Sequence, residues 1–386
     1  TTTGTAGTAD TVNITANGLV TYTNGNTTET TTLSGESAAV TYSVGALAAG
    51  GDIVVDGSQD VTISGAKASF HSAGTTAATI RAITDSSTGT STLKLTGTAA
   101  ATADLKHAAV DTIEVNGVQG TSTLELADGA NLDVTGIQTN VITLTRGTVA
   151  ATKSDATDVV NLSLDGASTA VLITSDSTTP ATEQAFNTVN FASNGAAAGT
   201  LTALLGNLTG NLNVSGATAL TLAATTTANS VDASAMSGAL TATVDTLTTD
   251  NVTGGSGDDQ ITIVTGAKAT VDGGTGSNTL VITGDVDDIT VTNFGIFSLS
   301  GSITSVETGF FTGTQVVTSA AAKTINFGTV ASEYTVTNVD ISNLVLNNIT
   351  SFTADATNGL SSALFTSTTG MSWQGSSVVD AVTGTA

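Results

Sequence analysis

Two glycine-rich stretches carry the residue types that bind a hard cation. Gly254–Thr262 reads GGSGDDQIT and Gly273–Val281 reads GGTGSNTLV, and we call them the first and the second repeat. Both fit the nonapeptide G-G-x-G-x-D-x-U-x, where U is a large apolar residue, with Asn278 at the position that Asp259 holds in the first repeat. Carboxylate, amide and backbone carbonyl oxygens are the ligands that Ca²⁺ prefers, so this pattern indicates a calcium site.

The spacing of the repeats predicts how such a site is built. Glycine tolerates positive φ and close backbone approach, so the first six positions predict a turn and the last three a short strand. Gly254 and Gly273 are 19 positions apart, which equals two turns of a coil plus one inserted residue, so Asp259 and Asn278 are expected to stack on one side. Asp287 holds the same position in a weaker turn, where we expect a second, weaker calcium site. Ordinary turns are also rich in Gly, Asp and Asn, and that interpretation stays open.

The elements that must position these turns are short strands. Runs such as Val61–Gly65, Leu132–Gly136 and Leu212–Gly216 alternate apolar and polar residues and end in glycine. This alternation, with turn residues about every 8–12 positions, predicts an all-β protein. Strands this short and numerous favour a β-solenoid, a parallel β-helix with calcium turns, about 20 residues per rung and on the order of 80 Å long. A β-sandwich-like N-terminal part before the solenoid is the alternative, because the same strand pattern serves both folds.

The chain of 386 residues is long enough for more than one domain. Thr174–Ala185 contains the single proline and many Ser and Thr residues, which is typical of a linker. We therefore expect a β-rich N-terminal domain at 1–175, a β-ladder with the calcium turns at 186–310 and a β-rich C-terminal region at 311–386.

Charge and composition exclude several classes of partner. The chain has 8 Lys and Arg residues against 32 Asp and Glu residues, a net charge of −24. Nucleic acids and anionic membranes attract basic surfaces, so neither is an expected partner. The chain contains no run of about 18 apolar residues, so membrane insertion is not expected. No signal-peptide pattern opens the chain. The chain contains no Cys, so its stability must come from sheet hydrogen bonds, packing and metal.

Catalytic residues are not expected. His71 and His107 are the two histidines, and they lie in different regions without metal-ligand spacing. Arg81 and Arg146 are the two arginines, which leaves a polysaccharide-cleaving groove almost without basic groups to hold its substrate. We therefore expect that the protein is not an enzyme.

Five segments carry a further resemblance, namely Phe186–Phe191, Val231–Leu240, the first repeat, Val281–Gly301 and Ile303–Gly309. By these segments, and over about residues 110–310, the chain resembles Gram-negative S-layer proteins of the RTX (repeats-in-toxin) type. The resemblance implies secretion without a cleaved signal peptide, calcium-triggered folding outside the cell and assembly into a lattice. The chain departs from the pattern in having two clear repeats and Asn278 in place of Asp. The calcium-binding positions that follow are Gly255, Gly257, Asp259, Gly274, Gly276, Asn278 and Asp287.

The sequence thus favours an extracellular structural protein of the bacterial cell surface, which binds copies of itself in a calcium-stabilised surface layer. Cell-surface polysaccharide is a further candidate partner. Two alternatives stay open: a head-to-tail subunit of a surface filament, and an adhesin or carbohydrate-binding module on a β-helix. Negative-stain images would distinguish the first alternative, because a surface layer forms two-dimensional sheets and the appendage forms filaments. A groove with clustered aromatic and acidic residues would support the second alternative.

Overall fold

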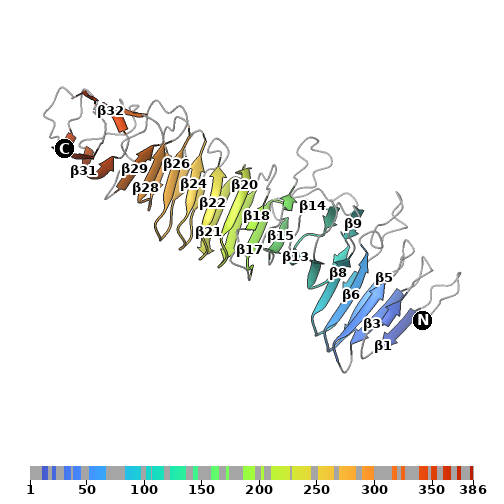
Figure 1. The fold of residues 1–386 in the computed structure, drawn as a ribbon. Helices are drawn as coiled ribbons and strands as arrows, with labels where there is room; N and C mark the ends of the chain where they lie inside the picture. The colour runs from blue at the N-terminus through green and yellow to red at the C-terminus, as the bar shows by residue number, and fades with distance from the viewer. Residues whose placement is uncertain are drawn as a thin grey trace. The chain divides into compact units, whose positions relative to one another are not determined.

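The protein is all-β, and its computed structural model is a parallel β-solenoid with strands β1 to β35 (Figure 1). The described part of the chain contains no helix, and so none that is long and apolar enough to span a membrane. The structure describes the strands given below and the residues 38–39, 58–60, 86–90, 107, 110–111, 127–129, 158, 186–187, 194–195, 210, 217–219, 228–229, 237–239, 254–259, 264, 273–278, 283 and 293–295.

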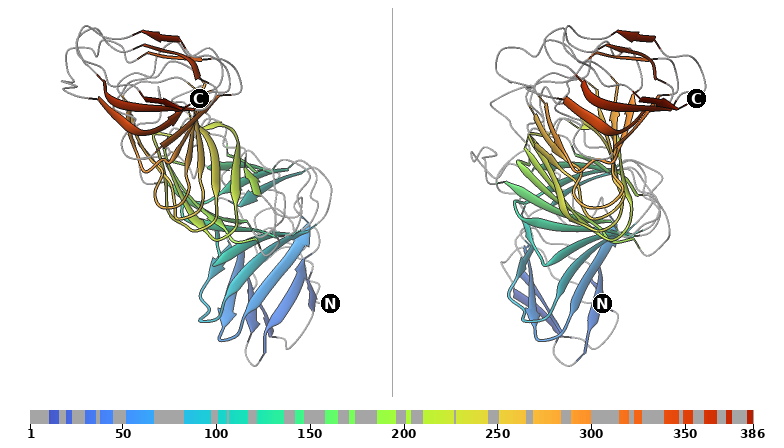
Figure 2. Two further views of the ribbon diagram at one scale, coloured as in Figure 1. Left: turned by 60° about the vertical axis from the view of Figure 1, so that its left-hand side comes forward. Right: turned by 90° about the vertical axis from the view of Figure 1, so that its left-hand side faces the viewer.

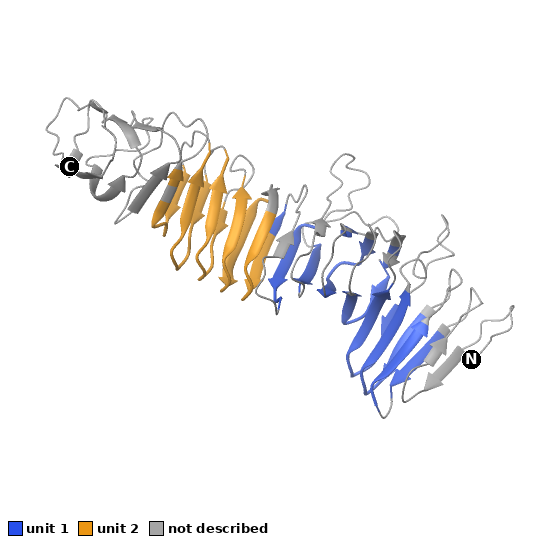
Figure 3. Cartoon of the chain, in the orientation of Figure 1, with its two compact units in different colours: residues 1–211 blue, residues 212–386 orange. Residues whose placement is uncertain are grey.

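Residues 1–211 form the first of two compact units, here unit 1 (Figure 3). Its strands are β1 (Thr11–Thr15), β2 (Val20–Tyr22), β3 (Thr30–Gly35), β4 (Val40–Val44), β5 (Asp52–Gly57), β6 (Val61–Ala66), β7 (Ile83–Asp85), β8 (Ser91–Thr96), β9 (Ala101–Leu105), β10 (Ala108–Ala109), β11 (Thr112–Asn116), β12 (Ser122–Leu126), β13 (Ala130–Thr135), β14 (Ile142–Arg146), β15 (Val159–Leu164), β16 (Val171–Ile173), β17 (Thr188–Ser193) and β18 (Leu201–Ala203).

Successive strands of unit 1 belong to different sheets, so the chain winds as a coil. The long sheet has the order β2-β4-β6-β8-β11-β13-β15-β17 within this unit, and two shorter sheets have the orders β1-β3-β5-β7-β10 and β16-β14-β12-β9. Neighbouring strands within each sheet pair in parallel. A parallel pair needs a crossover connection, and here the strand of the opposite sheet provides it.

The alternating pattern of the sequence sets the inside of this coil. In β8 and β15 every second side chain is buried, and the side chains between them are partly exposed. Many of the buried residues stack from turn to turn, because their register partners in successive strands are also apolar. One such column consists of Leu93, Ile113, Leu132, Leu162 and Phe191. Burial of this apolar surface stabilises each rung by about 25 cal/mol per Å².

Residues 212–386 form unit 2 (Figure 3). Its strands are β19 (Asn211–Gly216), β20 (Leu220–Thr226), β21 (Ser230–Met236), β22 (Leu240–Val244), β23 (Asn251–Thr253), β24 (Gln260–Ile263), β25 (Ala269–Asp272), β26 (Thr279–Ile282), β27 (Ile289–Thr292), β28 (Ile296–Leu299), β29 (Gln315–Ser319), β30 (Lys323–Asn326), β31 (Val339–Leu346), β32 (Ile349–Thr353), β33 (Leu360–Thr366), β34 (Ser372–Gln374) and β35 (Thr383–Thr385).

The chain of unit 2 winds in the same way. From β19 to β28 successive strands alternate between two sheets, and a third sheet follows. Within this unit the orders are β19-β21-β23-β25-β27, β20-β22-β24-β26-β28-β29-β31-β33-β35 and β30-β32-β34. Figure 2 shows the yellow and orange strands of unit 2 following one another around a common interior. Buried valines fill one side of that interior in register, namely Val231, Val252, Val271 and Val291.

The prediction of an all-β solenoid is confirmed. Parallel pairing runs from β1 to β17 in unit 1, so the β-sandwich alternative for the N-terminal part is wrong for the described residues. The division into domains at 1–175, 186–310 and 311–386 stays a prediction, and the linker Thr174–Ala185 lies outside the described residues.

Candidate functional site

The two repeats form turns in unit 2 that stack on neighbouring turns. We use the name turn stack for the four turns at 237–239, 254–259, 273–278 and 293–295, each of which joins a strand of one sheet to the next strand on the other. Backbone hydrogen bonds connect successive turns. Ser256 N donates to Met236 O at 2.8 Å, Thr275 N donates to Gly255 O at 2.9 Å, and Gly295 N donates to Asn278 O at 3.2 Å.

Glycines at fixed positions of the repeats allow the turns to lie this close together. A Cβ atom at Gly257 would lie 2.5 Å from the carbonyl oxygen of Gly238, and one at Gly255 would collide with the carbonyl oxygen of Met236 at the end of β21. In the second repeat, Gly274 and Gly276 also have φ angles of 73° and 112°, which only glycine adopts without strain. The prediction of positive φ or close backbone approach at these positions is confirmed.

Asp259 is buried inside the turn stack, with 1% of its surface exposed. Its Oδ1 accepts a hydrogen bond from Leu240 N at 2.7 Å, and its Oδ2 accepts one from Gly255 N at 2.8 Å. The carboxylate therefore joins its own turn to the start of β22, one rung earlier. Buried N–H groups need such acceptors, because an unsatisfied one costs about 1–3 kcal/mol.

Asn278 continues the connection to the next turn and is fully buried. Its Oδ1 accepts a hydrogen bond from Asp259 N at 2.9 Å, and its Nδ2 donates to Asn293 O at 3.0 Å. The 19-residue spacing predicts that Asp259 and Asn278 stack on one side of the coil, and the structure brings them together there. Asp287, the third predicted side chain, lies outside the described residues.

Burial also affects the charge of Asp259. Desolvation raises the pKa of its carboxyl group, the hydrogen bonds from Leu240 N and Gly255 N lower it, and the negative charge of Asp258 raises it further. The net result is a raised pKa, since the desolvation is the largest of these influences.

The groups around Asp259 do not fit a cation in this arrangement. Ca²⁺ takes about six to eight oxygen ligands, whereas both oxygens of Asp259 and the side-chain oxygen of Asn278 face backbone N–H groups. Within the described residues, no three His, Cys, Asp or Glu side chains gather where one metal ion could contact them. Calcium binding by the glycine carbonyls, Asp259 and Asn278 therefore stays a prediction from the motif.

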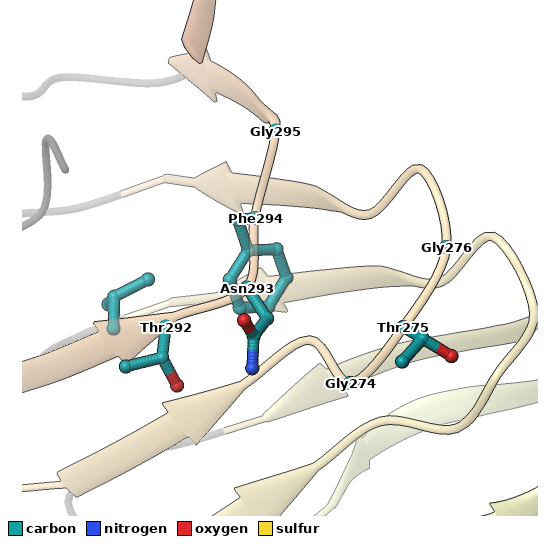
Figure 4. Close-up of a pocket in the computed structure, with 8 residues that line it drawn as sticks. Gly274, Thr275, Gly276, Thr292, Asn293, Phe294 and Gly295 are labelled. Carbon is teal, nitrogen blue, oxygen red and sulfur yellow. The ribbon is translucent and has the colours of Figure 1, made fainter. Parts of the chain in front are cut away.

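The turn stack ends at a hollow of about 340 Å³ (Figure 4). Gly274–Gly276 of the second repeat form one wall and Val291–Gly295 form the other. The turn at 293–295 has three residues where the turn of the second repeat has six, so it reaches Asn278 but leaves Gly274 and Gly276 at the hollow. The lining residues include no charged side chain, so the hollow offers only backbone, hydroxyl, amide and apolar groups.

Sequence reasoning missed a ladder of asparagines on the outer face of the long sheet in unit 1. Asn161 Nδ2 donates to Asn131 Oδ1 at 2.8 Å, and Asn190 Nδ2 donates to Asn161 Oδ1 at 2.7 Å. Asn131 Nδ2 in turn donates to Asp111 O at 2.9 Å. Each asparagine directly precedes a residue of the buried column, namely Leu132, Leu162 or Phe191. That adjacency was the available signal for this asparagine ladder.

The same face carries a column of threonines. Thr41, Thr62, Thr92 and Thr112 are register partners in β4, β6, β8 and β11. All four are partly exposed. Neighbouring strands lie about 4.8 Å apart, so the hydroxyl-bearing side chains of this threonine column follow one another at that spacing.

Two aspartates meet at a buried serine in unit 1. Ser91 Oγ donates to Asp85 Oδ2 at 2.5 Å, and Ser91 N donates to Asp111 Oδ2 at 2.8 Å. Ser87 N and Ser87 Oγ both donate to Asp85 Oδ1, at 2.8 and 2.7 Å. No histidine takes part in these hydrogen bonds, so the group is not a hydrolytic triad and joins successive rungs instead.

No family model matches the chain, and no curated protein and no solved structure matches it.

Proposed function

We propose that the chain is an extracellular structural protein that assembles with copies of itself into a bacterial surface layer, as the resemblance to RTX-type S-layer proteins implies. Its role is mechanical: stacked rungs form a scaffold and their outer faces meet other copies. Cell-surface polysaccharide is the second partner that this function calls for, because a layer must be held to the cell.

The observation that carries the proposal is the regular outer face of unit 1. The threonine column and the asparagine ladder place small polar side chains at the same position of successive rungs. The even spacing of these side chains suits contact with an equally regular surface, such as that of a second copy. Polar rather than apolar side chains keep this face soluble until many weak contacts act together.

Charge gives calcium a place in this proposal. With a net charge of −24, copies of the chain repel one another at close range. Exposed aspartates among the described residues include Asp56, Asp60, Asp128, Asp232 and Asp258. Divalent cations shared between such groups of neighbouring copies would remove the repulsion, and carboxylate oxygens are the donors that Ca²⁺ prefers. In this proposal calcium acts between copies.

Electron microscopy of the purified full chain tests this function. We expect ordered two-dimensional sheets in millimolar calcium and dispersed particles after chelation, with sheets returning when calcium is restored. Magnesium at the same concentration is the control for general screening, and it should be less effective because it dehydrates reluctantly. Isolated particles under all conditions would contradict self-assembly, and filaments in place of sheets would favour the head-to-tail alternative.

A further inference from the structure

We propose that Asp259 and Asn278 form a clamp that closes the turn stack through the protein's own N–H and C=O groups, at the place where the repeat motif indicates a cation. The residue type at each of the two positions matches the polarity of its backbone partners. The proposal is independent of self-assembly, because it concerns the interior of one chain.

In the first repeat, both partners are hydrogen-bond donors. Leu240 N and Gly255 N point at the two oxygens of Asp259, at 2.7 and 2.8 Å. A carboxylate offers an acceptor on each side, whereas an amide offers an acceptor on one side and a donor on the other. Aspartate therefore fits this position, and asparagine would place its NH₂ group against a backbone N–H.

In the second repeat, the partners have opposite polarity. Asp259 N donates to Asn278 Oδ1, while Asn293 O accepts from Asn278 Nδ2. An amide supplies the required acceptor and donor, and the reverse orientation of the side chain would bring two donors and two acceptors together. A carboxylate at this position would face the carbonyl oxygen of Asn293. Asn278 is thus the residue that this pair of partners requires, and not a weakened calcium ligand.

Burial gives the matching its importance. Asp259 is 1% exposed and Asn278 is fully buried, so water cannot replace a lost partner. The adjacent Asp258 provides a contrast, because it is exposed and its Oδ1 accepts a single hydrogen bond from Ser277 N at 2.8 Å. Loss of its charge leaves that acceptor in place, since an amide oxygen can accept the same hydrogen bond.

The test is thermal melting of the full chain and three variants, Asp259→Asn, Asn278→Asp and Asp258→Asn, each in calcium and in EGTA. We expect Asp259→Asn and Asn278→Asp to melt below the wild type by on the order of 5 °C, by the same amount in both buffers. Asp258→Asn should melt with the wild type, which separates the clamp from a general effect of charge removal.

A calcium site at these residues predicts the opposite sign for one variant. Asn278→Asp restores the aspartate of the repeat motif, so it would melt above the wild type in calcium and below it only in EGTA. That result would overturn the clamp. So would an Asp259→Asn variant that melts with the wild type in EGTA and falls below it only in calcium. If Asp259→Asn does not fold, the sign of the Asn278→Asp shift in calcium decides by itself.

Discussion

Replacing Gly274 with alanine tests how far the turn stack depends on close backbone contact. Gly274 has a φ of 73°, and a Cβ atom there would collide with the carbonyl oxygen of Gly255. A residue with a side chain costs about 1–2 kcal/mol in the left-handed region. Displacement of closely packed atoms costs a further amount of about 1–3 kcal/mol. We therefore expect Gly274→Ala to lower the free energy of unfolding by about 2–5 kcal/mol.

Three other glycines separate the two contributions. Gly129 has a φ of 72°, and a Cβ atom there would have no other atom within 4 Å, so Gly129→Ala should show only the conformational cost of about 1–2 kcal/mol. Gly257 has no positive φ, but its Cβ would lie 2.5 Å from Gly238 O, so Gly257→Ala should show only the packing cost of about 1–3 kcal/mol. Gly295 has neither feature, so Gly295→Ala should be neutral or stabilise by about 0.4–1 kcal/mol.

Urea denaturation followed by far-ultraviolet circular dichroism measures these differences. The expected order of stability is Gly295→Ala, then Gly129→Ala and Gly257→Ala, then Gly274→Ala. If Gly274→Ala is as stable as Gly295→Ala, the turns do not stack at the distance that the structure gives, and the explanation of the repeat glycines fails.

Three further predictions concern unit 1 and the assembled layer. Asn161→Ala removes the donor to Asn131 and the acceptor for Asn190, so we expect a loss of about 1–2 kcal/mol in urea denaturation; a neutral result would show that the asparagine ladder adds no stability. Burial is the largest influence on Asp85 and raises its pKa, but hydrogen bonds from Ser87 and Ser91 together outweigh it, so the pKa is lowered. The ionised Asp85 carboxylate therefore stabilises the fold above the unfolded pKa of about 3.9, and this stability is lost as the pH falls through the lower folded pKa. In melting curves recorded at different pH values, Asp85→Asn should remove this part of the dependence on acid. Chelation should disperse the sheets, which light scattering would show. Calorimetry on the same sample should find that chelation leaves the melting temperature of the chain unchanged.

The fold could be predicted because its main determinant is local. Alternation in segments such as Leu132–Gly136 assigns an inner and an outer face before any pairing is known, and the Gly punctuation marks where each strand ends. The 19-residue spacing of the repeats also predicts that Asp259 and Asn278 meet. In both cases the sequence pattern has the same period as the structure: alternation matches the two faces of a strand, and the 19-residue spacing matches the stacking of the turns.

The polarity of the clamp could not be predicted in the same way. The partner of Asn278 is a carbonyl of Asn293, which belongs to a turn without the motif, so the motif contains no information about it. The asparagine ladder was missed for a related reason. Its members are 30 and 29 positions apart, whereas the repeats are 19 apart, so the register depends on how many residues separate the strands at each rung.

Hydrogen exchange at three backbone amides tests most directly whether the chain's own groups close the turn stack. Leu240 N and Gly255 N donate to Asp259, and Asp259 N donates to Asn278. We expect these three amides to be protected in a chelator as strongly as in calcium. If they exchange freely in the chelator and become protected only when calcium is added, the metal closes these turns and the proposed clamp does not exist.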